Sequence, residues 1–143
     1  MVPVSQLLAG KGKDIYSLSP DAPVLEAIRL MADKSVGALL VMEGDQLLGI
    51  LSERDYARKV ILMGRSSKDT PVSAIMTPAP LVTVSSHSRT KECMRLMTDR
   101  RIRHLPVVDN GKVVGMLSIG DLVRSIIEGL EGEVEQLKQY IAG

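Results

Sequence analysis

Short apolar runs alternate with stretches of helical spacing along the first half of the chain. Two apolar runs flank the polar turn Glu43-Gly44-Asp45-Gln46, a pattern typical of two buried strands joined by a hairpin. The stretch after Pro23 has apolar residues three and four positions apart, which predicts an amphipathic helix. The elements expected are strand 15–18, helix 24–33, strand 36–42, strand 47–51 and helix 52–63.

The same series returns 66 residues later. Arg29-Leu30-Met31 recurs as Arg95-Leu96-Met97, and Ser52-Glu53-Arg54-Asp55 recurs as Ser118-Ile119-Gly120-Asp121. Asn110-Gly111 supplies the hairpin turn of the second copy. The second series is strand 81–84, helix 89–99, strand 104–108, strand 113–117 and a helix from 118. Two copies are too few for a solenoid, so the repeat predicts an α+β fold of two pseudo-symmetric β-α-β-β-α units.

The repeat divides the chain into four segments. They are an N-terminal segment 1–13, a first repeat 14–70, a second repeat 71–129 and a C-terminal helix 130–143. An apolar stripe begins just before the boundary at residue 130 and continues through the C-terminal segment. Its residues are three and four positions apart: Ile127, Leu130, Val134, Leu137 and Ile141. The stripe predicts an amphipathic helix outside the repeat, which packs either on its own chain or on a second chain.

Composition narrows the function classes. The 143 residues carry a net charge of +1, so bulk electrostatics favours neither nucleic acid nor an anionic membrane as a partner. Phe and Trp are absent and there are three Tyr, which predicts an aliphatic core. The same shortage argues against single-stranded nucleic acid binding, which relies on stacking aromatic rings.

The few cysteine and histidine residues also exclude some chemistry. Cys93 is the single cysteine, so no internal disulfide forms and a reducing compartment is expected. With His87 and His104 it shows no zinc-ligand spacing, so no metal is predicted, and Cys93 is expected to pack in the core. The chain lacks a signal-peptide pattern and any apolar run near the roughly 20 residues of a membrane span. We therefore expect a cytoplasmic protein.

The repeated Ser-x-x-Asp motif follows a buried strand in both copies and has two interpretations. Ser52 and Ser118 are good N-cap residues, and an acid three positions later resembles a capping box. Alternatively, the carboxylates of Asp55 and Asp121 accept hydrogen bonds from the two neighbouring hydroxyls of a ribose. The two interpretations are compatible, because the serine can cap the helix while the carboxylate also contacts a ligand.

A cluster of cations precedes the first hairpin strand of the second copy only. Arg101, Arg103 and His104 stand there, where the first copy has the uncharged Ser35-Val36-Gly37-Ala38. Charge beside a buried strand is costly unless it faces a cleft or a partner. The asymmetry suggests that one side takes an anion and the other a flat apolar group. The alternative is a solvated cluster neutralised by neighbouring aspartates.

Taken together, these motifs resemble a tandem pair of CBS domains, the Bateman module, of the stand-alone bacterial and organellar type. The resemblance rests on the duplicated unit, on Gly-h-h-Ser-x-x-Asp in both copies (h is apolar), on Met76-Thr77-Pro78, and on the Arg-His-Leu-Pro-Val-Val run from Arg103 to Val108. It covers about residues 14 to 129. It implies two repeats packed sheet to sheet, with clefts between them that bind AMP, ADP, ATP, S-adenosylmethionine or NAD(H).

The resemblance also implies a role for individual residues. Ribose would be held by Asp55, Ser52, Asp121 and Ser118, phosphate by Arg103, His104 and Arg54, and adenine by Ile15, Tyr16, Gly37, Ala38 and Val82. In this family the basic pair reaches across to the phosphate in the first cleft. Because the first copy has no such pair to offer the second cleft, we expect the Asp55 cleft to be better occupied.

These expectations favour a regulatory module that senses the energy or redox state by binding an adenine nucleotide and is not an enzyme. The module would be a homodimer and would act on a regulated protein that the sequence does not identify. A second hypothesis is a structural dimerisation or interaction protein without a nucleotide ligand, whose motifs only cap helices. A third is an enzyme acting on a nucleotide. The third is the weakest, because His104 is the only plausibly placed general base.

Overall fold

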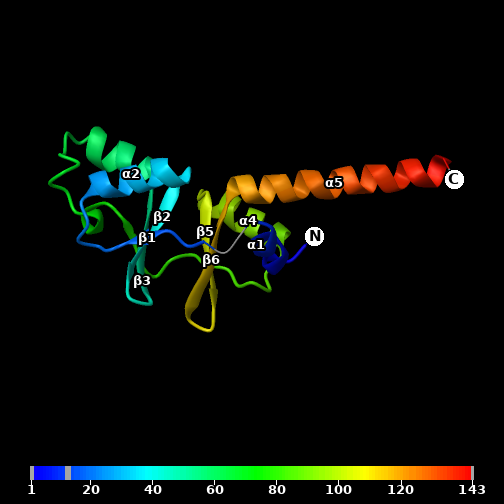
Figure 1. The fold of residues 1–143 in the computed structure, drawn as a ribbon, viewed down its shortest axis with the longest axis horizontal. Coiled ribbons are helices and arrows are strands. Elements are labelled where there is room, and N and C mark those ends of the chain that lie inside the picture. The colour runs from blue at the N-terminus through cyan, green and yellow to red at the C-terminus, as the bar shows by residue number, and fades with distance from the viewer. Residues whose placement is uncertain (1, 12–13, 143) are drawn as a thin grey trace. The chain divides into compact units, whose positions relative to one another are not determined.

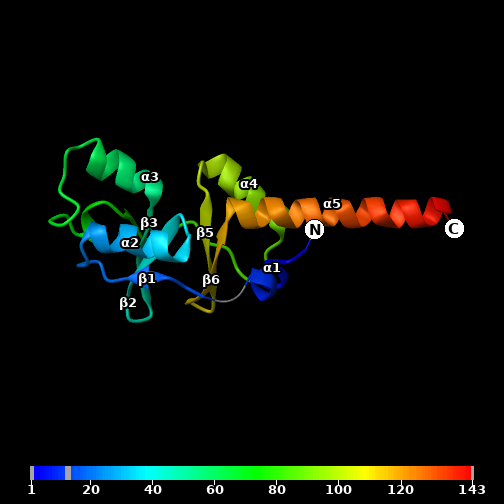
Figure 2. The same cartoon turned by 45° about the horizontal axis from the view of Figure 1, so that its top comes forward.

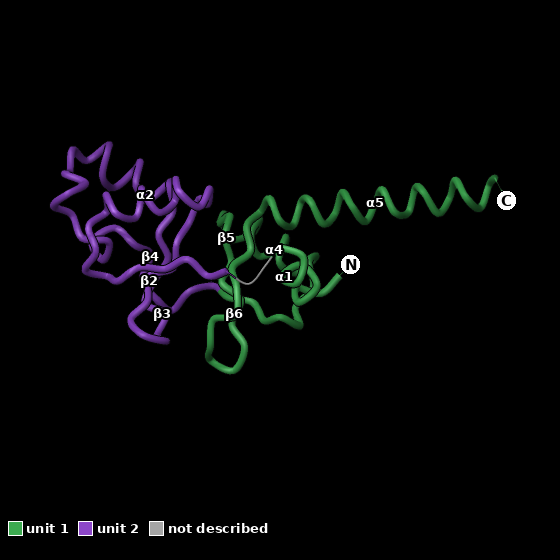
Figure 3. Tube along the Cα trace, viewed as in Figure 1, with its two compact units in different colours: residues 1–13, 83–143 green, residues 14–82 purple. Residues whose placement is uncertain are grey.

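The structure is a computed structural model that describes residues 2–11 and 14–142, shown from two directions in Figures 1 and 2. The chain divides into two compact units. One comprises residues 14–82, and the other joins residues 1–13 to residues 83–143 (Figure 3). Each unit contains the helix-strand-strand-helix part of the predicted series, so the α+β class and the duplication are confirmed. Among the described residues, no helix is both long and apolar enough to cross a membrane.

The unit of residues 14–82 is a four-stranded sheet with helices. Its elements are β1 (Ser17–Leu18), α2 (Val24–Lys34), β2 (Ala38–Glu43), β3 (Gln46–Ser52), α3 (Glu53–Tyr56), a π-helical stretch (Ala57–Ile61), a 3-10 turn (Val72–Ala74) and β4 (Thr77–Pro78). The strand order is β1-β2-β3-β4, with β1 parallel to β2 and the other pairs antiparallel. Buried α2 residues at helical spacing join the apolar side chains of β2 and β3 in one core, made by Val24, Ala27, Met31, Leu39, Val41 and Leu51 among others.

The second unit contains α1 (Val4–Lys11), α4 (Thr90–Arg100), β5 (His104–Asp109), β6 (Lys112–Ser118) and α5 (Ile119–Ala142). One sequence expectation was wrong here. The expected strand 81–84 is a single bridge between Val84 and Val107. In the unit of residues 14–82 Leu40 N donates to Tyr16 O, whereas the equivalent Pro106 of β5 has no N–H to donate, which explains the shorter pairing here. The helix expected from 118 and the C-terminal helix expected over 130–143 are parts of one continuous helix, α5.

The two units share backbone details as well as element order. Both hairpins have a register shift at the same place, between Val41 and Met42 and between Val107 and Val108. Helices α2 and α4 end on residues in the left-handed region, Ser35 and Arg101, each with φ 54° and ψ 44°. Because these irregular features recur at the 66-residue offset, the repeat is structural and not only a similarity of composition.

The N-terminal helix α1 belongs to this symmetry. Val4 N donates to Ser88 O at 2.8 Å, just as Val72 N donates to Ala22 O at 2.8 Å in the other unit. Val2-Pro3-Val4-Ser5 therefore occupies the place that Thr70-Pro71-Val72-Ser73 occupies in the unit of residues 14–82.

Glycines at two equivalent strand positions, Gly49 of β3 and Gly115 of β6, leave room for a side chain that follows each of these segments. A Cβ at Gly115 would lie 2.7 Å from Leu8 Cδ2, and one at Gly49 would lie 2.7 Å from Met76 Sδ. Real Cβ atoms essentially never approach so closely. Glycine at both positions lets Leu8 and Met76 lie directly on the second hairpin strand of their own unit.

Candidate functional site

Asp55 lies in the first turn of α3, where it closes a capping box. Its backbone N–H donates to Ser52 Oγ at 3.2 Å, while Ser52 N donates to Asp55 Oδ2 at 2.9 Å. Ser52 Oγ is also 3.1 Å from the same carboxylate oxygen. The Nζ of Lys59 lies 3.3 Å from Oδ1 and donates to Ile75 O at 3.0 Å. The side chain of Asp55 is only 15% exposed, so its carboxylate is held in a fixed position.

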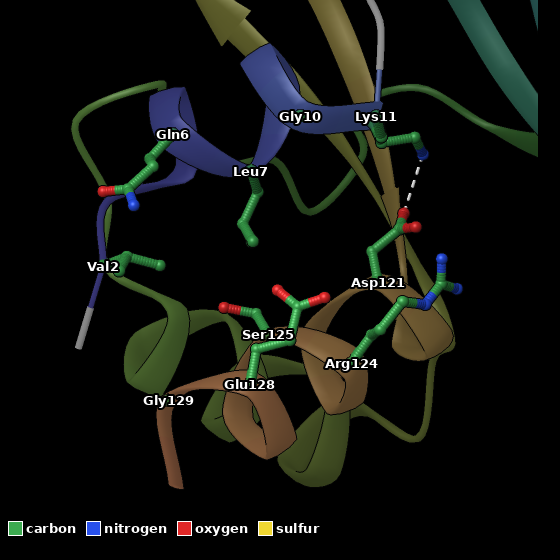
Figure 4. Close-up of a pocket in the computed structure, with 10 residues that line it drawn as sticks. All are labelled: Val2, Gln6, Leu7, Gly10, Lys11, Asp121, Arg124, Ser125, Glu128 and Gly129. Carbon is green, nitrogen blue, oxygen red and sulfur yellow. Dashed lines mark hydrogen bonds and ion pairs between the residues drawn. The ribbon is translucent and has the colours of Figure 1, made fainter. Parts of the chain in front are cut away.

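Asp121 repeats this arrangement at the start of α5, with a different cation. Ser118 N donates to Asp121 Oδ2 at 2.8 Å, and Asp121 N donates to Ser118 Oγ at 3.2 Å. Figure 4 shows Lys11 of α1 pointing at this carboxylate; its Nζ lies 2.7 Å from Oδ2 and also donates to Met116 O at 2.8 Å. Burial by itself raises the pKa of Asp121, but the hydrogen bonds from Lys11 and Ser118 outweigh burial and lower it.

The capping interpretation of Ser-x-x-Asp is therefore confirmed in both copies. Each motif satisfies the free N–H groups at a helix start, which stabilises the first turn. The ribose interpretation is not tested by these contacts and stays a prediction. The two carboxylates differ in their distance to the neighbouring lysine ammonium, because Lys11 is closer to Asp121 than Lys59 is to Asp55.

Each motif lies beside the first residues of the preceding hairpin strand. In the unit of residues 14–82, Ala38 pairs with Ser52, and Glu53 N donates to Gly37 O at 3.0 Å. In the other unit His104 pairs with Ser118, and Ile119 N donates to the carbonyl oxygen of Arg103 at 2.8 Å. The structure thus brings Gly37 and Ala38 to Ser52, and the basic pair to Ser118.

The remaining predicted residues take varied positions. Tyr16 precedes β1, and its backbone carbonyl oxygen accepts a hydrogen bond from Leu40 N at 3.2 Å. The centroid of its ring lies 5.5 Å from the Nζ of Lys34. Ile15 is half-buried next to it, Arg54 is exposed in α3, and Val82 is half-buried at the end of its unit. Among the described residues, no group of three or more histidine, cysteine, aspartate or glutamate side chains could hold a metal ion. Cys93 is buried in α4, as expected, and burial is the main cause that raises the pKa of its thiol to about 11.

Sequence analysis missed both lysines, Lys59 beside Asp55 and Lys11 beside Asp121. Lys11 and Asp121 line a hollow of about 430 Å³ between α1 and α5, and the other charged lining residues are Arg124 and Glu128 (Figure 4). Two cations and two carboxylates leave this hollow without an excess of positive charge for a phosphate. The available signal was the similarity between Val2-Pro3-Val4-Ser5 and Thr70-Pro71-Val72-Ser73, which would have placed α1 inside the repeat.

His104 is expected to make stability depend on pH. Burial is the largest effect and lowers the pKa of its imidazole; Asp121 opposes the shift, while Lys11 and Arg103 add to it. The unfolded chain therefore takes up the proton at higher pH than the folded chain, so the free energy of unfolding falls as pH drops below about 6.5. Urea unfolding at about pH 7.5 and about pH 5.5 should show a smaller difference for His104→Gln than for the wild type.

His87→Gln is the control for this measurement, because it makes the same change at an exposed histidine of the same unit. A His104→Gln protein that loses as much stability on acidification as the wild type would show that another group carries the effect.

Comparison with known proteins decides the family. The model of the CBS domain matches residues 11–61 and again residues 72–128. The chain belongs to the CBS-domain family. The two matches confirm the tandem pair that the sequence motifs indicated.

Named relatives support the assignment over nearly the whole chain. The mitochondrial CBS domain-containing protein CBSX3 of Arabidopsis thaliana is 42% identical over 148 residues, which is 98% of this chain and 72% of the relative. A solved CBS-domain protein from Burkholderia ambifaria MC40-6 is 52% identical, with a TM-score of 0.85 over 89% of this chain and 95% of that one. The CBS domain protein PAE2072 from Pyrobaculum aerophilum, complexed with AMP, is 28% identical, with a TM-score of 0.78 over 92% and 99%.

Proposed function

We propose that this CBS pair is a regulatory module that binds an adenine nucleotide, AMP, ADP, ATP or NAD(H), and catalyses no reaction on it. The observation that carries the proposal is the repeated carboxylate, held by backbone contacts and only 15% exposed at Asp55 and 12% exposed at Asp121. An ionised carboxylate has acceptor sites for both hydroxyls of a ribose. The AMP complex of the Pyrobaculum relative supports the ligand class.

The residues proposed for each part of the ligand follow the family pattern. Ribose contacts Asp55 with Ser52 and Asp121 with Ser118; adenine contacts Ile15, Tyr16, Gly37, Ala38 and Val82; phosphate contacts Arg103, His104 and Arg54. The neighbourhood of Ser52 supports this assignment, because Gly37 and Ala38 lie beside it and offer backbone groups without bulky side chains. His104 favours its neutral form, so Arg103 supplies the permanent positive charge of the basic pair.

Asp55 is proposed to be the better ligand site of the two. The ammonium of Lys11 lies 2.7 Å from Asp121, whereas that of Lys59 lies 3.3 Å from Asp55. A ribose must compete with these lysines for the carboxylate, and the closer, charge-assisted contact is harder to displace. The asymmetry of the lysines therefore agrees with the preference expected from the basic pair.

Regulation would follow from differential affinity. A nucleotide that binds one arrangement of the pair more tightly shifts the population toward it, and a second copy or a regulated protein reads the shift. A purely structural role is the second candidate. The capping boxes favour it, because capping alone explains why the serine and the aspartate occur together.

Asp55→Asn is expected to weaken AMP binding about tenfold in calorimetry, because a charge-assisted hydrogen bond contributes roughly 1.5 kcal/mol or more. The asparagine oxygen can still accept from Ser52 N, so the fold should be kept. Asp45→Asn is the matched control, since Asp45 is an exposed aspartate in the hairpin turn of the same unit. Titration with adenosine as well as AMP separates the ribose contact from the phosphate contact, because a lost ribose contact should weaken both ligands by the same factor.

The structural alternative predicts a different set of results. A ligand that binds only the folded chain raises the unfolding midpoint by mass action. If saturating AMP, ATP and NAD leave the midpoint unchanged, the chain is a structural module and the nucleotide proposal is wrong. If AMP binds equally to wild type and Asp55→Asn, the ligand is right but Asp55 is not in its site.

A further inference from the structure

The C-terminal part of α5 extends away from the unit in which the helix begins. Near its start Leu122 is buried, and Ser125 and Ile126 are half-buried against the unit. From Ile127 to Ala142 every residue is exposed. In Figures 1 and 2 the helix continues well past α1 and α4 of its own unit. Something other than this unit must therefore account for the composition of the exposed part.

That exposed part, together with Val123 one turn earlier, carries an apolar stripe in a heptad pattern. The stripe is made by Val123, Ile127, Leu130, Val134, Leu137 and Ile141, which are between 42% and 82% exposed. Its steps are four, three, four, three and four residues, so 127, 134 and 141 are a positions and 123, 130 and 137 are d positions. β-branched residues fill every a position and leucine fills two of the three d positions, the combination that favours a parallel two-stranded coiled coil.

Helix energetics agree with a missing partner. Gly129 and Gly132 each cost roughly 1 kcal/mol in a helix interior relative to alanine. An isolated helix of about 15 residues is marginal in water even without such residues. Both glycines fall at outer positions, c and f, so they leave the apolar seam intact. The helix is therefore weak by itself but suited to stabilisation along the seam.

Charges flanking the seam identify the partner and its direction. Glu133 occupies a g position and Lys138 the e position five residues later. In a parallel, in-register pair the g residue of one helix meets the following e residue of the other, which creates two equivalent Glu133–Lys138 attractions. In the antiparallel pair that uses the whole stripe, Val134 would pack against Leu130, and Glu133 would lie near its own copy, which is repulsive. The pattern is therefore complementary to itself in the parallel arrangement.

We propose that residues 123–141 of α5 form a parallel, in-register, two-stranded coiled coil with the same segment of a second copy. The seam is about 27 Å long at 1.5 Å per residue. This inference assigns a surface to the homodimer expected from the sequence, and it requires no nucleotide. Its failure and that of nucleotide binding can therefore be observed separately.

The first test removes the seam. The wild type should sediment as a dimer at micromolar concentration in the absence of nucleotide, and the double variant Leu130→Ser/Leu137→Ser should sediment as a monomer. Leu62→Ser is the matched control, because Leu62 is 76% exposed in the other unit and lies outside the stripe. AMP calorimetry on the same proteins shows whether the units still bind ligand. A monomeric wild type, a seam variant that stays dimeric, or dissociation by Leu62→Ser would overturn the proposal.

The second test addresses direction and register. Glu133→Lys and Lys138→Glu should each weaken the dimer, and the double swap should restore it. Ile141→Cys should form an interchain disulfide, because equivalent a positions face each other only in the parallel arrangement; Cys93 is buried with a raised thiol pKa and should not compete. A dimer in which the swap fails to restore association, or in which the Ile141→Cys variant does not cross-link, would contradict the parallel pairing.

Discussion

Leu8→Ala is expected to lower the free energy of unfolding by about 2 to 5 kcal/mol, the range for truncating a buried leucine. The side chain of Leu8 is 5% exposed and lies against Gly115 of β6. Its removal leaves a cavity, and because the glycine has no side chain of its own, little can move to fill it. Urea unfolding followed by circular dichroism measures the loss, since the chain contains no Trp.

Leu62→Ala is the matched control for this prediction, because it makes the same change at an exposed position and should cost well below 1 kcal/mol. Met76→Ala tests the equivalent contact on Gly49 in the other unit and should be costly as well. If Leu8→Ala costs no more than Leu62→Ala, α1 is an appended helix and does not belong to the core of its unit.

Sequence patterns were sufficient for the elements that carry their own periodicity. Helices α2 and α4 have apolar faces at helical spacing, and each hairpin joins two apolar runs across a turn with glycine at Gly44 or Gly111 in a left-handed conformation. The 66-residue offset then supported each element by its copy. Local pattern and duplication pointed to the same answer, which is why these elements were predicted close to their observed bounds.

Contacts between distant residues could not be predicted in this way. The N-terminal segment is offset by 68 residues from its counterpart at 70–73, so an ungapped shift of 66 does not align it. Lys11 contacts Asp121, which lies 110 residues away in the sequence, and no local sequence pattern predicts such a pair.

The site was predicted as a motif, while its electrostatics required the structure. Ser-x-x-Asp was predicted to cap a helix or to hold a ribose, and the hydrogen bonds show the first role in both copies. The second role depends on what competes for the carboxylate. Both aspartates face a lysine, so a ribose that contacted either carboxylate would have to displace or share that cation. Under the proposed function, the two carboxylates should therefore differ in affinity for the nucleotide.

Asp121→Ala is expected to destabilise the protein by about 2 to 3 kcal/mol at neutral pH. The substitution removes charge-assisted hydrogen bonds from Ser118 N and Lys11 Nζ, worth roughly 1.5 to 3 kcal/mol each before partial replacement by water. The contribution of Lys11 is reduced because its side chain is 36% exposed. Ser118→Ala should cost about 1 kcal/mol, since it removes the cap but keeps the carboxylate.

Measurements at low pH distinguish the contribution of the Asp121 charge to stability from the contribution of its side-chain packing. The pKa of Asp121 is lowered in the folded chain, so its stabilisation is present above the unfolded value near 3.9 and is lost as pH falls through the folded value. The difference in unfolding free energy between wild type and Asp121→Ala should therefore shrink in strongly acidic solution. Lys11→Met should reproduce part of the loss of unfolding free energy seen in Asp121→Ala. If Asp121 also accepts a ribose, the same substitution should tighten AMP binding at Asp121, because the competing ammonium is removed. A difference that persists unchanged below about pH 3 would mean that the aspartate acts through packing and not through its charge.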